Sequence, residues 1–482
     1  MVEKQKKMMI LGASELQVPA IKKAKELGYQ VICVDYNEKA VGFELADIKL
    51  VVSTLDQEEV YRQALIYRPD VVITSTSDGP VRTAAYVNEK LGKRPDLSYE
   101  NALCATIKSK MRDRLKECGV PIPEYYAAAD YTAFSGAVDK LHGDCIVKPA
   151  DNAGSRGVVH LAVVEHGGGT QSFDALSLEY ERRQSDAETQ RLFAYSGRIG
   201  RLLRETYDYS LGNSRNGTVM VEEYMHGPEV SVEIMVIAGE PHVLTITDKY
   251  ITPPPYFVEL AHCEPSGLDA GTQEQIRKVA AQAVRAIGIE NAPAHVEIKV
   301  TEEGPKIVEL AARLGGDFIT SRLVPLSTGI DMVGASVLLA TGETPDLTPK
   351  WNRGAAIHFI SVSNETSGVL AQAFDECRES QVPAAGLMSR QLETGDLTSV
   401  SNETGGGREG VISRITVPDA LYGLAGVEEI SLYKRAGDHV QGTHSSNDRL
   451  GHVITTGETP EQAMELGKQV LSQIGVEITY EG

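Results

Sequence analysis

The 482-residue sequence predicts an α/β protein of three domains, and two observations carry this prediction. Residues 8–107 alternate short apolar strands with helices, a βαβ pattern that implies a parallel sheet. Residues 295–310 instead alternate polar and apolar side chains around a turn, as an antiparallel hairpin does. The length accommodates about three domains of ordinary size. We assign them to residues 1–107, 108–345 and 346–482, the last being mainly antiparallel.

The first domain is predicted to begin with a buried strand at 8–11 that runs into Gly12. A helix at 19–28 and strands at 30–35 and 70–74 complete the βαβ order. Gly12 followed by Asp35 is a partial match to a dinucleotide site, but the full G-x-G-x-x-G motif is missing. We therefore expect this domain to line a substrate cleft and not to bind NAD or FAD.

The hairpin carries two glutamates that favour a metal site. Pairing Val300 with Lys306 across the turn places Glu297 directly opposite Glu309. Opposed like charges are destabilising unless something bridges them, and Mg²⁺ binds through one or two carboxylates plus nucleotide phosphates. Arg313 adds a fixed positive charge that can stabilise negative charge developing beside the metals. The alternative interpretation is two solvated glutamates, and a slip of one residue would remove their pairing.

Two lysines favour a phosphate site in the second domain. Lys148 lies inside the apolar strand at 145–150. Burying an unpaired ammonium group is costly, so a phosphate is the expected partner. Lys108 begins an amphipathic helix, where a solvated lysine is the simpler interpretation.

A glycine-containing loop and a polar stretch follow Lys148. Gly154 and its neighbouring glycine let backbone N–H groups face an anion, and Ser155 and Arg156 add donors. Residues 165–217 are polar, and we interpret them as an elaborated mobile lid and not as a separate domain. The whole lid is expected to span about residues 124–221.

Two further features are predicted to face substrates. The strand at 219–225 breaks at 226–228 and resumes at Glu229, a break that can present backbone groups to an adenine edge with Glu229 near a ribose. Glu259 and His262 follow the proline-rich segment 252–256. A single histidine is usually structural, but this pair is a candidate for holding a substrate amine.

The third domain is predicted to follow residues 342–345 and to consist of strands and hairpins before a final helix. Thr459, Pro460 and Gln462 form a capping box with proline at the first helical position. The glycines at 405–407 indicate a flexible loop.

Composition excludes several classes of protein. The apolar and charged fractions, 42% and 24%, are those of a soluble globular protein. A formal net charge of −20 argues against general binding to nucleic acid or to an anionic membrane. No run has the length of a spanning helix, and the N-terminus does not have the pattern of a signal peptide. Six cysteines without a C-x-x-C motif favour reduced thiols in the cytoplasm.

The order of these motifs resembles that of the ATP-grasp carboxylate–amine ligases over nearly the whole chain. Within that superfamily, the chain is most similar to the L-amino acid ligases that form dipeptides. Three features carry the second resemblance: E-x-A-A-R at Glu309 to Arg313, E-x-x-H at Glu259 to His262, and the run from His444 to Gly457. The stretch 165–217 is longer than this family would lead us to expect, so its role stays open.

The resemblance implies a role for each group of residues. Binding of ATP would involve Lys108, Lys148, Gly154, Ser155, Arg156, Glu222, Glu223, Tyr224, Met225 and Glu229. Glu297 and Glu309 would bind Mg²⁺, two ions being expected, with Mn²⁺ as an alternative. Substrates would contact Glu259, His262, Arg313, Gly315 and Gly316, with Arg313 and Lys148 catalytic. The family often has E-x-N at the second metal position, but Ala311 stands here in place of asparagine, so the coordination of a second ion stays open.

The implied activity is an ADP-forming ligase that activates a carboxylate as an acyl phosphate and joins it to an amine. One alternative keeps the fold but changes the acid to formate, bicarbonate or another biosynthetic carboxylate. A second alternative is a scaffold that binds ATP without turnover. The sequence names neither substrate, and a homodimer stays open because dimers are the commonest closed assembly.

Overall fold

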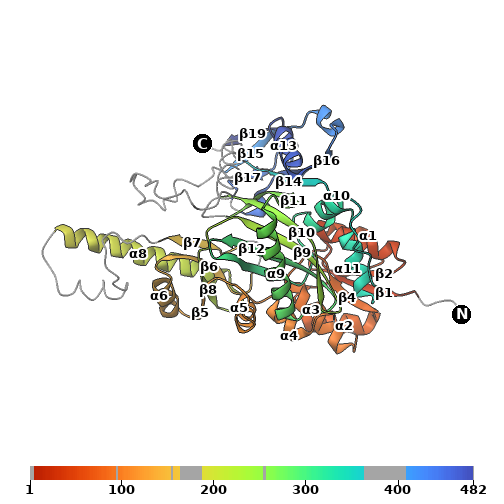
Figure 1. Cartoon of the computed structure of the whole chain (residues 1–482), viewed down its shortest axis with the longest axis horizontal. Helices are drawn as coiled ribbons and strands as arrows, with labels where there is room; N and C mark the ends of the chain where they lie inside the picture. Colours follow the sequence, from red (N-terminus) through yellow and green to blue (C-terminus); the bar gives the residue numbers. More distant parts are fainter. Residues whose placement is uncertain are drawn as a thin grey trace.

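The computed structural model describes residues 5–93, 96–152, 156–162, 187–252, 257–362, 409–443 and 445–480, with only the backbone for 187–198. It contains four sheets, and the largest has eight strands. The first sheet along the chain has parallel strands, and the sheets that follow it have antiparallel strands. This confirms the predicted fold class (Figure 1). The predicted loop residues Gly154 and Ser155, the loop at 405–407 and His444 lie outside the described residues.

The N-terminal sheet is parallel, with the strand order β3-β2-β1-β4. The predicted strands are confirmed within a residue or two, because short buried apolar runs between helices identify parallel strands. The elements are β1 (Lys7–Leu11), η1 (Glu15–Gln17), α1 (Val18–Glu26), β2 (Gln30–Asp35), η2 (Val41–Glu44), β3 (Ile48–Val51), α2 (Gln57–Tyr67), β4 (Val71–Thr74), α3 (Gly79–Lys90) and α4 (Tyr99–Cys104).

The partial dinucleotide motif has a structural role in this sheet. The buried carboxylate of Asp35 accepts hydrogen bonds from the backbone N–H of Ala13 at 2.8 Å and of Asn37 at 2.9 Å. Gly12 has a φ of +107°, and a Cβ there would lie 3.1 Å from Cδ of Gln17. The loop after β1 is thus filled by the protein's own side chains.

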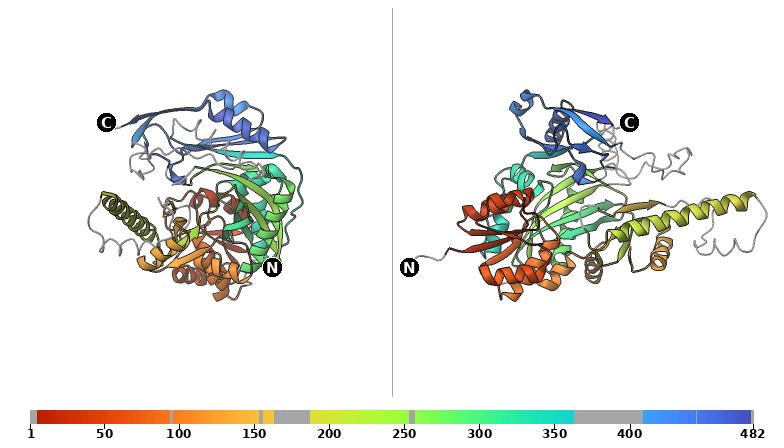
Figure 2. Two further views of the ribbon diagram at one scale, coloured as in Figure 1. Left: turned by 60° about the vertical axis from the view of Figure 1, so that its left-hand side comes forward. Right: turned by 180° about the vertical axis from the view of Figure 1, so that it is seen from behind.

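A second sheet, of order β5-β8-β6-β7, forms the lid region. Its long helix α8 projects away from the body of the molecule (Figures 1 and 2). The sequence analysis assigned residues 165–217 to a polar lid without giving the bounds of this helix. The elements are α5 (Lys108–Glu117), which precedes the lid, and β5 (Tyr125–Ala128), α6 (Tyr131–Lys140), β6 (Asp144–Pro149), β7 (Val159–Ala162), α8 (Ala187–Gly212) and β8 (Val219–Glu223).

The eight-stranded sheet has the order β13-β12-β9-β10-β11-β14-β18-β16. Helix α9 packs on β10, β12 and β13. It begins at the cap Asp269, whose carboxylate accepts from the N–H of Thr272, and ends at Gly288, which has a φ of +78°. The elements are β9 (Glu229–Ile237), β10 (Glu240–Ile251), β11 (Glu259–Glu264), α9 (Ala270–Ile287), β12 (Pro293–Thr301), β13 (Gly304–Ala311), β14 (Gly354–Ile360), β16 (Val427–Leu432) and β18 (Gly451–Gly457).

Three short helices join this sheet to the N-terminal domain: η3 (Ile319–Leu323), α10 (Val324–Thr328) and α11 (Met332–Ala340). Helix α11 packs against α1, and their side chains share one core with β14 of the sheet. Within the described residues, no single helix is long and apolar enough to cross a membrane. The segments 319–328 and 332–340 meet that length and composition only when taken together, across a bend of 115°.

The last third of the chain completes the eight-stranded sheet and adds a small one of order β17-β15-β19. The predicted final helix is confirmed, and Oγ1 of Thr459 accepts from the N–H of Gln462. Strands β14, β16 and β18 follow the predicted boundary after residue 345, yet they extend the central sheet. The eight-stranded sheet therefore contains strands from both sides of this boundary, which stays a prediction. The further elements are β15 (Gly410–Thr416), η4 (Asp419–Gly423), β17 (His439–Val440), η5 (Ser446–Asp448), α13 (Pro460–Leu471) and β19 (Gly475–Tyr480).

Candidate active site

A cleft lies between the lid sheet and the eight-stranded sheet, with about 930 Å³ of space including its open mouth. Most predicted ATP-binding residues line it, so residues distant in sequence converge as expected. His262, Arg313, Gly315 and Gly316 are not among the lining residues. The predicted residues that line it are Lys108, Lys148, Arg156, Glu222, Glu223, Tyr224, Met225, Glu229, Glu259, Glu297 and Glu309.

The hairpin of β12 and β13 opposes Glu297 and Glu309 as predicted, although by a different register. Near the turn Val300 pairs with Pro305, so the predicted pairing of Val300 with Lys306 is wrong. The turn is tighter than expected because Gly304 already pairs with Thr301. A β-bulge then inserts one extra residue in β13, and this restores the opposition of the two glutamates.

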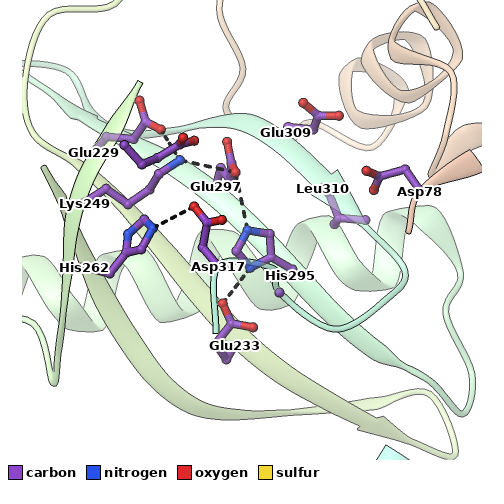
Figure 3. Close-up of polar contacts among 12 residues, drawn as sticks. Asp78, Glu229, Glu233, Lys249, His262, His295, Glu297, Glu309, Leu310 and Asp317 are labelled. Atoms are coloured by element: carbon purple, nitrogen blue, oxygen red, sulfur yellow. Dashed lines mark hydrogen bonds and ion pairs between the residues drawn. The ribbon is translucent and has the colours of Figure 1, made fainter. Parts of the chain in front are cut away.

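Each of these glutamates faces a lysine. Nζ of Lys108 lies 2.8 Å from Oε1 of Glu309 and donates to the carbonyl of Asn152 at 2.7 Å. Nζ of Lys249 lies 3.3 Å from Oε1 of Glu297 and 2.7 Å from Oε1 of Glu229 (Figure 3). Along one wall of the cleft, Glu309 is therefore paired with Lys108, and Glu297 with Lys249.

The charges of this wall hold one another ionised. Burial alone would lower the pKa of Lys108, but the attraction of Glu309 outweighs it and the pKa is raised. Burial would raise the pKa of Glu297, but Lys249 and His295 bring it well below its usual range. The sequence analysis missed Lys249, although a lysine inside a strand is the same signal that identified Lys148.

A second cluster holds Lys148. Nζ of Lys148 lies 2.6 Å from Oε2 of Glu222, which also receives Nη2 of Arg112 at 2.8 Å. Nε of Arg112, which is fully buried, donates to Oε1 of Glu222 at 2.9 Å. The carboxylate of Glu222 is therefore occupied by two cations. It positions Lys148, a role that the sequence did not suggest.

The protonation of this cluster follows from burial and pairing. Burial lowers the pKa of Lys148, with Glu222 opposing and Arg112 adding to the effect. Burial would raise the pKa of Glu222, but Arg112 and Lys148 lower it to about 2. A phosphate beside Lys148 would add a second negative charge and favour the ammonium form.

Two aromatic side chains, Tyr224 and Phe257, line the cleft, and His160 lies beside them. The rings of His160 and Tyr224 are stacked with centroids 3.9 Å apart, and Phe257 lies 6.4 Å from each. Ile146 and Ile251 also line this region. Flat apolar walls of this kind suit a planar base.

Glu259 and His262 are linked through Arg449 and Asp317. Nη2 of Arg449 lies 2.8 Å from Oε2 of Glu259, and Nη1 lies 2.9 Å from Oδ1 of Asp317. Nε2 of His262 lies 3.4 Å from Oδ2 of Asp317 (Figure 3). Arg449 stacks on the ring of Phe359 at 3.7 Å. Arg449 comes from the run 444–457, but its partners are 190 and 132 residues away, so no local pattern identified it.

Arg313 contacts the N-terminal domain and lies within the electrostatic field of the glutamate pair. Its Nε donates to Oδ1 of Asp78 at 2.8 Å and its Nη2 to Oδ2 at 3.2 Å. The neighbouring Gly315 is closely packed, because a Cβ there would lie 2.8 Å from Nδ1 of His295 and 2.9 Å from Oε2 of Glu233. The sequence predicted Arg313 but missed its partner.

His295 links Glu233, which packs beside Gly315, to Glu297 of the opposed glutamate pair. Its Nδ1 lies 2.6 Å from Oε1 of Glu233, and its Nε2 lies 3.4 Å from Oε1 of Glu297 (Figure 3). Burial would lower the pKa of His295, but Glu233 and Glu297 raise it to about 9. The histidine thus orients one oxygen of Glu297.

The donor set fits a cation delivered with phosphates. Glu297 and Glu309 face the cleft opposite each other, with side chains 25% and 33% exposed. Among the described residues, no three His, Cys, Asp or Glu side chains are placed to hold a metal together. Mg²⁺ typically binds through one or two carboxylates plus substrate phosphates, so two opposed glutamates are sufficient protein ligands.

Comparisons with known proteins agree with this geometry. Residues 198–321 match the ATP-grasp domain, and residues 407–479 match the L-amino acid ligase C-terminal domain 2. These two matches are consistent with the ATP-grasp superfamily of carboxylate–amine ligases. The second match indicates that the last part of the chain resembles the C-terminal domain of L-amino acid ligases.

The relatives and solved structures that resemble this chain include L-amino acid ligases. The chain is 24% identical to an L-arginine-specific L-amino acid ligase of Bacillus subtilis, over 60% of this chain and 62% of that protein. It is also 24% identical to an uncharacterised protein of Sinorhizobium fredii, of which it spans 60%. The fold is shared with an L-amino acid ligase from Bacillus licheniformis (TM-score 0.70, 18% identical, 99% of this chain and 100% of that one). It is likewise shared with a phosphoribosylglycinamide synthetase from Anaerococcus prevotii (TM-score 0.66, 18% identical, 99% and 100%).

Proposed function

We propose that this protein is an ADP-forming ligase that activates an amino acid carboxylate with Mg·ATP and joins it to an amine. The observation that carries the proposal is the opposed pair of Glu297 and Glu309, set with Lys108 and Lys249 along a cleft that Lys148 also lines. An opposed pair of acids with lysines beside it is the arrangement expected for binding a polyphosphate together with its metal.

In the first step, a carboxylate oxygen of one substrate attacks the γ-phosphorus of ATP. The bond from that phosphorus to the β–γ bridging oxygen breaks, and ADP and an acyl phosphate result. Lys108 and Lys148 both line the cleft, and in this proposal they neutralise the phosphate oxygens. Mg²⁺ held by Glu297 and Glu309 would neutralise further charge during the transfer.

In the second step, the amine nitrogen attacks the acyl carbon, the bond from carbon to the phosphate oxygen breaks, and the nitrogen loses a proton as phosphate leaves. Arg313 supplies positive charge beside the glutamate pair, where an oxyanion develops. Glu259 and Asp317 are acids suited to a substrate ammonium group, and Arg449 fixes both. The lid would exclude water that otherwise hydrolyses the acyl phosphate.

Release of ADP and phosphate tests the proposal with Mg·ATP and a panel of single amino acids and pairs. ADP release that requires a pair, with a product mass equal to both substrates minus water, would support it and name the substrates. ATP binding with silence across the panel would favour a non-amino-acid carboxylate, to be tried next, and silence there too would favour a non-catalytic scaffold.

The five cysteines that the structure describes are free thiols, which supports placing this reaction in the reducing cytoplasm.

A further inference from the structure

The ion pair between Asp78 and Arg313 joins residues that are 235 positions apart. Asp78 precedes α3 in the N-terminal domain, and Arg313 follows β13 of the hairpin that carries the glutamate pair. The two contacts of 2.8 and 3.2 Å form a fork in which both carboxylate oxygens face the guanidinium group. Such bidentate geometry fixes the plane of the guanidinium group as well as its position.

The loop that carries Asp78 is itself fixed on both sides. Nε2 of Gln17 donates to Oγ1 of Thr76 at 2.8 Å and to Oγ of Ser77 at 3.0 Å. On the other side, the backbone N–H of Leu314 donates to the carbonyl of Ser75 at 3.0 Å. The N-terminal domain thus holds Asp78 against the segment that begins with Arg313.

This arrangement leaves part of the guanidinium group for another task. Of its five N–H groups, two donate to Asp78 and a third donates to the carbonyl of Leu314 at 3.0 Å. Within the part of the chain that the structure describes, no protein acceptor is recorded for the remaining two. Glu297 and Glu309 both attract the charge of Arg313, so the group lies within the field of the glutamate pair.

We propose that Asp78 is a positioning residue for acyl transfer. It fixes the plane of Arg313 so that the two remaining N–H donors meet the oxyanion that forms when the amine attacks the acyl phosphate. The inference rests on the proposed function and assigns to the N-terminal domain a part in the second chemical step. It separates that step from the first, which depends on Lys108 and Lys148.

The separation of the two steps provides the test. Asp78→Asn keeps the size of the side chain but loses its charge, so Arg313 is less firmly oriented. Misplacement of a catalytic group by about 1 Å can cost on the order of 100-fold. We expect kcat for amide formation to fall by about 10- to 100-fold and the ratio of amide formed to ADP released to fall with it. The KM for ATP should stay within about twofold.

Four further variants complete the experiment. Asp78→Glu keeps the charge and should restore part of the lost amide yield. Arg313→Lys removes the fork, so adding Asp78→Asn to it should cause no further loss. Asp56→Asn is the matched control, because Asp56 is an acid of the same domain that caps α2 through the N–H of Glu59. It should leave the amide-to-ADP ratio unchanged.

The contrary outcomes are distinct. Normal amide yield in Asp78→Asn would overturn the inference while leaving the ligase proposal intact. An equal loss of ATP affinity, or losses that multiply in the double variant, would also overturn it, since Asp78 would then act independently of Arg313. Failure of the wild-type chain to release ADP with any substrate would overturn the proposed function and the inference together.

Discussion

At the scale of single residues, buried charges identify the site. Lys148 was predicted because an ammonium group inside an apolar strand needs a counter-charge. The structure supplies the carboxylate of Glu222 as that counter-charge, and Arg112 binds the same carboxylate. Lys249 carries the same signal, but Asp248 and Tyr250 beside it make its strand look less apolar. Partners such as Arg112 and Arg449 lie more than 100 positions from the groups they hold, so no sequence window contains both members.

Replacing Lys148 should weaken nucleotide binding. Lys148→Met removes the ammonium group that faces the cleft but leaves Glu222 paired with Arg112. A hydrogen bond to a charged group is worth about 1.5–3 kcal/mol, so the Kd for ATP should rise by about 10- to 100-fold. Isothermal titration calorimetry measures this, with Lys140→Met on the exposed side of the lid as control. Equal affinity of wild type and Lys148→Met would remove Lys148 from the phosphate site.

Glu264 should make stability depend on pH. This fully buried carboxyl group accepts hydrogen bonds from Thr247 at 2.8 Å and Ser327 at 2.9 Å, and burial raises its pKa to about 8. The folded state therefore holds a proton that the unfolded state has lost above about pH 4.5. As pH rises from about 5 to 8, this linkage lowers the free energy of unfolding, and the loss levels off above pH 8.

Glu264→Gln removes that linkage. Relative to wild type, the variant should gain stability as pH rises, by on the order of a few kcal/mol between pH 5 and pH 8.5. Urea denaturation at the two pH values measures the difference. A gap between the two proteins that does not change with pH would show that Glu264 is already ionised in the folded state.

At the scale of elements, local patterns were sufficient for strands, caps and the hairpin. Alternation identified β12 and β13, and turn chemistry located the reversal. The tighter turn shifts the pairing of the two strands by one residue from the predicted register, and the bulge shifts it back. Glu297 therefore faces Glu309 as predicted, although the pairs nearer the turn differ from the prediction. Bulges depend on packing of neighbouring strands, which a local pattern does not record. Helix α8 does carry an apolar stripe, with Ile199, Leu203 and Tyr207 buried in the core of the lid, but the polar residues around it led the sequence analysis to assign the stretch only to a lid.

The hairpin glutamates should be essential for the phosphoryl step. Glu309→Ala removes one metal ligand and the partner of Lys108, so ADP formation should be abolished, with a loss of at least about 100-fold. Circular dichroism should show an unchanged fold, because the side chain is one third exposed. Glu303→Ala in the exposed turn of the same hairpin is the control and should keep full activity. Retained turnover in Glu309→Ala would remove Glu309 from the metal site.

At the scale of the whole molecule, three chain regions meet around one segment. Residues 313–317 contact Asp78 of the N-terminal domain through Arg313, and Arg449 of the C-terminal region through Asp317. The topology that achieves this joins β11 to β14 and β14 to β18, strands far apart in sequence. The resemblance predicted which residues belong to the site, but this long-range pairing decides which of them touch.

Arg449 should link substrate recognition to the C-terminal region. In Arg449→Lys a single ammonium group replaces a fork that holds both Glu259 and Asp317. We expect kcat/KM for the amino acid substrates to fall by about tenfold or more, while the Kd for ATP stays within about twofold. Arg435→Lys, at an exposed position of the same region, is the control. A parallel loss of ATP affinity would indicate a general structural role instead.

The transfer of an oxygen atom tests the central claim most directly. If a substrate carboxylate attacks the γ-phosphorus, one of its oxygens leaves with inorganic phosphate when the amide forms. With substrate labelled by ¹⁸O in its carboxylate, the account predicts one ¹⁸O atom in the released phosphate and none in ADP. Label in AMP, with pyrophosphate as the second product, would contradict the acyl phosphate, and so would phosphate that carries no label while amide accumulates.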